Sequence, residues 1–281
     1  MPQGVSIHVG LNRVDPGHYQ GWDGKLVACE FDANDMAELA GGKGFATQTL
    51  LTEAATAQAL TSAVEKTAET LQSGDILLLS YSGHGGQVPD TNGDEQDRMD
   101  ETWVLFDRQV VDDELYALWS KFKPGVRIAI FSDSCHSGTV AREAVDAVGE
   151  ERVARSMNGE DDPGQPRVKG MPDELIRSVY EKNKELYDEI QKSLPPFDKA
   201  EIGASVILTS GCQYNQTSLD GDKNGLFTQS LLQVWNKDKF RGGYRMFRKR
   251  IAQKMPPWQS PNFFIAGKAD SKFASQHPFT V

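Results

Sequence analysis

The segment Asp75-Ile-Leu-Leu-Leu-Ser-Tyr-Ser-Gly-His-Gly85 joins a continuous apolar run to a glycine-flanked histidine. A second segment, Val126-Arg-Ile-Ala-Ile-Phe-Ser-Asp-Ser-Cys-His-Ser-Gly138, repeats the plan and places Cys135 51 residues after His84. Continuous apolar runs are typical of strands that are buried on both faces of a sheet. Two such strands could bring His84 and Cys135 together, which matters because a thiol nucleophile needs a nearby base.

The rest of the chain alternates in the same way. Apolar runs predict six strands, at 5–11, 46–51, 75–81, 126–132, 205–210 and 262–266. Helices are predicted between them, at 32–39, 54–71, 113–122 and 226–235. This alternation favours an α/β fold with a mostly parallel sheet. Ligands of such sheets bind beyond the carboxyl ends of the strands, where His84 and Cys135 lie.

One interval breaks the alternation, and we interpret it as an insertion at 149–202 within a single domain that covers residues 1–281. Its first part, 149–172, is rich in charged residues, glycine and proline, which predicts a mobile stretch. Residues 173–194 carry apolar side chains at helical spacing and predict one amphipathic helix.

Composition excludes several classes of partner. The net charge is −10, and ten acidic residues against two arginines lie between Asp90 and Glu114, a field that repels nucleic acid. The longest apolar runs are too short to span a bilayer. Three cysteines, an odd number, fit a reducing compartment, and the N-terminus lacks the pattern of a secretory signal. We therefore expect a cytoplasmic protein without nucleic-acid or membrane partners.

Singly, a cysteine after an apolar run is usually a small core residue, and a histidine is more often structural than catalytic. The pair is more informative, because glycine and serine beside each residue permit tight turns and close substrate approach. His136 is a rival base, although a neighbour in a strand or turn usually points away from Cys135.

The two motifs together resemble those of the metacaspases and their bacterial relatives among the caspase-like cysteine peptidases. The resemblance covers roughly residues 4–145 and 203–267, and implies a caspase-like three-layer sandwich. Further matching segments are Asn12, Leu26-x-x-Cys29-x-x-Asp32, Asp100-Glu101, Val111-Asp-Asp113, Ser210-Gly-Cys212, Gln216-Thr-Ser218 and Gly225-Leu-Phe-Thr228.

This resemblance implies an endopeptidase that works through an acyl-enzyme. Cys135 would be the nucleophile, and His84 the general base and then the acid for the leaving amine. The backbone N–H groups of Gly85 and Cys135 would form the oxyanion hole. The dyad requires no cofactor.

The resemblance also implies an acidic substrate pocket built from Asp32 and Asp133, with Cys29 and Ser82 beside them. Two carboxylates would favour an arginine or lysine before the scissile bond, so the expected substrates are peptides and proteins with basic residues. The alternative is structural, with Asp32 capping a helix and Asp133 bracing a turn. Tyr214 departs from the family, many members of which carry aspartate there.

Calcium is a further expectation from the family, with Asp100, Asp112 and Asp113 as ligands. The fourth acidic position aligns with Arg142, which weighs against calcium dependence and favours a solvated acidic surface. The loop at 90–101 is not an EF-hand, because its sixth position is Glu95 rather than glycine.

The sequence is also compatible with other activities. The same fold could serve as an inactive scaffold or binding protein, and the same dyad could catalyse transpeptidation. Basic residues in the insertion offer sites for self-cleavage, namely Arg152, Arg155, Arg167 and Lys169. By resemblance to metacaspases we expect a monomer.

Overall fold

The computed structural model describes residues 1–93, 95, 97–135, 167–194, 201–212 and 218–281. Its centre is a six-stranded sheet in the order β11-β9-β7-β3-β1-β2. The strands pair in parallel except β11, which runs antiparallel to β9. Their bounds are Gly4–Gly10 (β1), Ala46–Leu51 (β2), Ile76–Ser82 (β3), Arg127–Asp133 (β7), Ser205–Ser210 (β9) and Phe264–Gly267 (β11).

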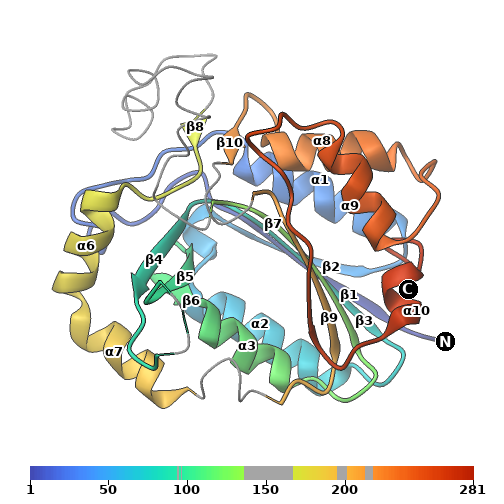
Figure 1. Ribbon diagram of the computed structural model, residues 1–281, viewed down its shortest axis with the longest axis horizontal. Helices are drawn as coiled ribbons and strands as arrows, with labels where there is room; N and C mark the ends of the chain where they lie inside the picture. The colour runs from blue at the N-terminus through green and yellow to red at the C-terminus, as the bar shows by residue number, and fades with distance from the viewer. Residues whose placement is uncertain (94, 96, 136–166, 195–200, 213–217) are drawn as a thin grey trace.

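Helices cover both faces of this sheet, so the predicted three-layer α/β fold is confirmed (Figure 1). One face carries α2 and α3, and the other carries α1, α8 and α9. The bounds are Cys29–Gly42 (α1), Ala57–Thr70 (α2), Asp112–Ser120 (α3), Leu226–Trp235 (α8), Tyr244–Ala252 (α9) and Ser271–Ser275 (α10).

The main sheet has a hydrophobic core on each face, because side chains alternate in direction along its strands. Successive strand residues point to opposite faces, so Leu77 and Leu79 of β3 pack toward α2 and α3, while Ile76 and Leu78 pack toward α1 and α8. All four side chains are buried. A strand with apolar residues at every position is therefore stabilised by both helical layers.

Smaller sheets that the sequence did not predict lie beside the main one. The strands β4 (Gly85–Pro89), β5 (Met99–Val104) and β6 (Gln109–Val111) form an antiparallel sheet directly after His84. Two short strands, β8 (Arg167–Val168) and β10 (Leu219–Asp220), pair antiparallel.

The predicted insertion differs from expectation in its described part. Residues 149–166 and 195–200 lie outside the described residues. The single helix expected at 173–194 is two helices, α6 (Asp173–Lys182) and α7 (Lys184–Ser193), which break at Asn183. Residues 167–172 were expected to be mobile, yet they include β8 and a fully buried Lys169. No helix within the described residues is long and apolar enough to cross a membrane.

A pair of glycine substitutions tests the packing of α1 against β1. A Cβ at Gly10 would overlap the carbonyl oxygen of Cys29, whereas one at Gly41 in the last turn of α1 meets nothing closer than Thr47 at 3.8 Å. We expect Gly10→Ala to lower the free energy of unfolding by about 1–3 kcal/mol. Gly41→Ala should raise it by about 0.5–1 kcal/mol.

Urea denaturation of both variants beside the unsubstituted protein checks this prediction. Equal midpoints for the two variants would contradict the packing described here.

Candidate active site

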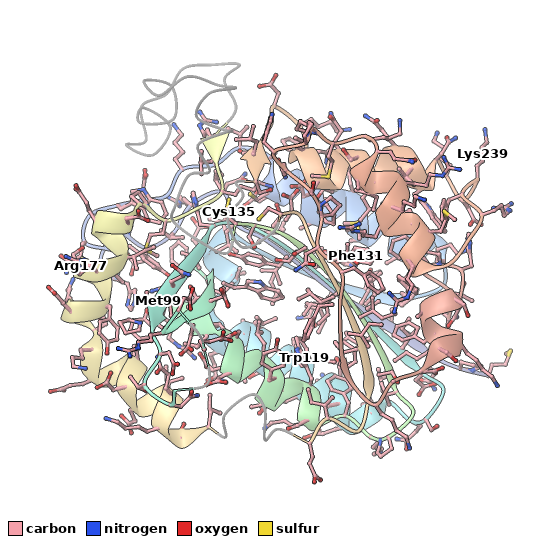
Figure 2. All side chains as sticks on the ribbon, viewed as in Figure 1. Met99, Trp119, Phe131, Cys135, Arg177 and Lys239 are labelled. Atoms are coloured by element: carbon pink, nitrogen blue, oxygen red, sulfur yellow. The ribbon has the colours of Figure 1, made fainter. Side chains whose placement is uncertain are left out.

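His84 and Cys135 follow the carboxyl ends of the neighbouring strands β3 and β7. Both residues are buried, with 5% and 1% of their surface exposed. Their backbones meet closely, because a Cβ on Gly85 would overlap the carbonyl oxygen of Cys135. Figure 2 shows Cys135 at the edge of the sheet where these strands end. Glycine at position 85 therefore permits the two segments to lie together.

The imidazole of His84 is oriented by the backbone. Its Nε2 lies 2.8 Å from the carbonyl oxygen of Gly24, and the ring of Trp22 packs on it with centroids 4.6 Å apart. A carbonyl oxygen only accepts hydrogen bonds, so Nε2 carries the proton of the neutral ring. Nδ1 is then the basic atom: among the residues that the structure describes it makes no hydrogen bond of normal geometry, although the backbone of Gly170 lies close enough to raise the pKa of the ring slightly.

The thiol of Cys135 is held by Ser218, the residue that precedes β10. Ser218 donates its backbone N–H to Sγ over 2.7 Å, and Sγ lies 3.6 Å from the Ser218 carbonyl oxygen. No hydrogen bond joins the sulfur to His84 in this conformation, because Nδ1 of His84 is unpaired. The structure thus brings the two predicted catalytic residues to one edge of the sheet without direct hydrogen bonding.

Two backbone amides converge on a single oxygen beside the sulfur. The N–H groups of Cys135 and Gly85 both donate to the carbonyl oxygen of Lys169, at 3.0 and 3.1 Å. Lys169 in turn donates its own N–H to Ser218 over 2.9 Å, and Met171 donates to Gly85 over 2.8 Å. The segment around Lys169 is therefore bound across the site like an extended peptide.

The side chain of Lys169 enters a closed acidic pocket and has no exposed surface. Glycine at position 225 leaves room for the ammonium, since a Cβ there would overlap it. Nζ lies 2.9 Å from Ser82 Oγ, 3.0 Å from Asp32, 3.3 Å from Asp133 and 3.8 Å from Asp220.

Burial and opposite charges set the ionisation of this pocket. Burial alone would lower the pKa of Lys169, but the carboxylates of Asp133 and Asp32 raise it well above its ordinary value. Burial raises the pKa of Asp32 to about 6, although Lys169 opposes this shift. Burial also raises the pKa of the Cys29 thiol, which keeps that thiol protonated. The pocket therefore holds an ion pair at neutral pH.

The alternative, purely structural roles of Asp32 as a helix cap and Asp133 as a brace hold for Asp133 only in part and for Asp32 not at all. Asp32 lies inside α1, and the N-cap is Ala28, so Asp32 does not cap that helix. Asp133 accepts hydrogen bonds from Ser218 Oγ at 2.7 Å and from both N–H and Oγ1 of Thr228. Asp133 therefore braces the start of α8 and also faces the lysine.

Of the predicted metal ligands, Asp112 lies near both of the others: burial raises its pKa most, and the charges of Asp100 and Asp113 raise it further. Asp113 accepts a hydrogen bond from Asn92 over 2.7 Å, and Asp100 is buried on β5. Within the described residues, Glu95, Glu101 and Asp112 form a group of three acids whose oxygens all lie within 4.8 Å of one another. Burial and the nearby Glu95 raise the pKa of Glu101 to about 7, as expected for carboxyl groups that are crowded together.

Several residues singled out in the sequence lie outside the described part of the chain: His136, Arg142, Arg152, Arg155, Tyr214 and Gln216.

The family model for the caspase domain matches residues 14–272. The chain belongs to the caspase domain family. Metacaspase-1 of Mycosarcoma maydis is 28% identical over 83% of this chain and 62% of its own length. Metacaspase-1 of Kluyveromyces lactis is 34% identical over 56% of this chain and 39% of its own length. The chain is thus a metacaspase-type member that spans only part of these relatives.

Solved structures agree on the fold. Protein GSU0716 of Geobacter sulfurreducens has 50% sequence identity and a TM-score of 0.87, and the match covers 100% of this chain and 99% of that one. Caspase-1 of Spodoptera frugiperda has 11% identity and a TM-score of 0.55 over 95% of this chain and 86% of that one, a likeness of fold alone.

Sequence reasoning missed three parts of this caspase-domain site. Asp220 faces Lys169 and also accepts the N–H of Val27 over 2.7 Å, ahead of α1. Gly24 orients His84, and Lys169, which the sequence offered only as a self-cleavage site, fills the pocket from a segment expected to be mobile. None follows an apolar strand, so no local pattern pointed to them.

The ionisation of His84 gives a test of its burial. Burial lowers the pKa of His84 to about 4, against the opposing effect of the Gly24 carbonyl. The imidazole of the unfolded chain has a pKa near 6.5, so the unfolded state binds the proton first as the pH falls. The contribution of neutral His84 to stability is therefore complete above pH 6.5 and declines as the pH falls toward 4.

NMR titration of the His84 ring carbon signals checks this, with an expected midpoint near pH 4. A midpoint near 6.5 would show a solvated ring. The Lys169→Ala variant should shift the midpoint upward, because Lys169 is a secondary cause that lowers this pKa.

Proposed function

We propose that this chain is a cysteine endopeptidase that hydrolyses peptide bonds after lysine or arginine. The observation that supports it is Lys169, whose side chain fills the acidic pocket while its carbonyl oxygen accepts the amides of Cys135 and Gly85. A substrate bound in the same way would present its carbonyl carbon beside the Cys135 sulfur.

In the proposed mechanism, Nδ1 of His84 takes the thiol proton and the sulfur of Cys135 attacks the carbonyl carbon. The resulting oxyanion is stabilised by the N–H groups of Gly85 and Cys135, the type of interaction that contributes about 3–4 kcal/mol. His84 then gives its proton to the leaving amine, and water hydrolyses the thioester with His84 again as base. The Gly24 carbonyl keeps Nδ1 available throughout, because it holds the proton on Nε2.

The pocket favours cations for a simple physical reason. Asp32, Asp133 and Asp220 are all at most 2% exposed, and three buried carboxylates repel one another unless a cation lies between them. An aspartate side chain in this pocket would add a fourth negative charge. Cleavage after acidic residues is therefore disfavoured.

No step of this mechanism passes through a metal ion. Glu95, Glu101 and Asp112 are the residues that would hold Ca²⁺, through carboxylate oxygens of the kind that this ion prefers. We propose that calcium, where it acts, influences the fold around β5 and α3 rather than the dyad.

Peptides that end in lysine or arginine with a fluorescent leaving group test the proposed activity. We expect turnover that falls by about 100-fold or more in Cys135→Ala and His84→Ala. Asp32→Asn should raise KM for these peptides, because it removes one charge from the pocket. Glu189→Gln, the same chemical change on the exposed side of α7, is the matched control. Activity that survives Cys135→Ala contradicts the mechanism.

The bound segment also predicts where the protein cuts itself. Prolonged incubation of purified protein should release a fragment that begins at Gly170, because the Lys169–Gly170 bond lies across the site. Cys135→Ala should remain intact, and Lys169→Gln should lose this cleavage, whereas Arg167→Gln should keep it. Mass spectrometry of the fragments checks the prediction, and cleavage only after Arg152 or Arg155 would show that Lys169 is not bound as a substrate.

A further inference from the structure

The residue before Lys169 also occupies a defined pocket. Val168 is only 6% exposed and belongs to an apolar cluster separate from the two main cores. Its neighbours in this cluster are Cys135, Cys212 and Leu219, with the partly buried Trp258 packed against them. A side chain at this position is therefore enclosed by apolar groups, one of which belongs to the proposed nucleophile.

The walls of this pocket come from rigid parts of the fold. Leu219 is the direct cross-strand partner of Val168 in the β8–β10 pair. The thiol of Cys212 donates to the Ser134 carbonyl over 3.2 Å, at the end of β7. Next to Trp258, Gln259 is fully buried and donates to Ser218 Oγ over 3.0 Å. Hydrogen bonds thus fix two walls and strand pairing fixes the third.

The pocket also differs in charge from its neighbour. The walls that the described residues form around Val168 are Cys135, Cys212, Leu219 and Trp258, whereas Asp32, Asp133 and Asp220 surround the ammonium of Lys169 one residue further on. A glutamate in place of Val168 would lose its hydration and would lie near three carboxylates. A glycine would leave the apolar walls without contact.

We infer that the enzyme recognises two adjacent side chains, a branched aliphatic residue followed by lysine or arginine. Cys212, Leu219 and Trp258 are the residues that select the aliphatic side chain. This inference rests on the proposed function, since Val168 and Lys169 are taken to mark where a substrate binds. It adds a requirement on the residue before the lysine or arginine, whose side chain does not enter the acidic pocket.

Three fluorogenic peptides that differ only in the residue before lysine test the inference. We expect kcat/KM for the valine peptide to exceed that for the glycine peptide by about tenfold or more, and the glutamate peptide to be the poorest. Equal values for the three peptides would overturn the inference and leave the proposed function intact. No turnover of any of the three would overturn both.

Two variants separate recognition from stability. Trp258→Ala and Leu219→Ala should lower kcat/KM for the valine peptide by a larger factor than for the glycine peptide, so that the ratio of the two falls toward one. A general loss of folding would lower both values equally. Met246→Ala, on the outer side of α9 where Met246 is 45% exposed, is the control and should keep the ratio of the unsubstituted enzyme. An unchanged ratio in both pocket variants contradicts the assignment of these residues.

Discussion

The buried ammonium of Lys169 among the carboxylates of Asp32, Asp133 and Asp220 is the interaction on which the arrangement of the site depends. The four residues come from α1, the end of β7, β10 and the segment after β8, so one cluster of charges joins parts of the chain that are far apart in sequence. Removing one partner of a buried ion pair typically costs about 3–5 kcal/mol, because the remaining charge is left uncompensated. The same penalty makes the empty pocket a strong attractor for any cation of suitable length.

Parallel strands give the catalytic residues their position. The sheet brings the ends of β3 and β7 together, and the helices on both faces bury every residue of β3. His84 and Cys135 therefore follow strands whose backbone is fixed by the hydrophobic cores on both faces of the sheet. The absence of a side chain at Gly85 lets the two segments approach closely beyond the strand ends. Rigid strands with short glycine-containing ends explain how reactive groups can be buried and still be placed accurately.

The sequence was sufficient to predict what local pattern encodes. Apolar runs located the six main strands, and the glycines on either side of His84 marked the turn that follows β3. It was insufficient where partners lie far apart: Asp220 meets α1 across more than 190 residues, and nothing near it in the chain signals that contact. The prediction of mobility for residues 167–172 was wrong for a related reason. It rested on charge and glycine content within the segment, whereas the carboxylates that bury Lys169 come from distant parts of the chain. The break at Asn183 was equally invisible, because apolar spacing continues through it.

Ser218 has a consequence that extends beyond its own contacts. Its N–H bonds the Cys135 sulfur, its carbonyl accepts the N–H of Lys169, and its hydroxyl holds Asp133 and accepts from Gln259. Ser218 thus contacts the proposed nucleophile, the backbone of the bound segment and one carboxylate of the acidic pocket. A displacement there would alter the position of the nucleophile and the shape of the pocket at once, so a substitution at Ser218 changes reactivity and selectivity together. Trp258 is a better position at which to change the preference for the aliphatic side chain alone, because it packs against the apolar cluster and makes none of the contacts of Ser218 named above.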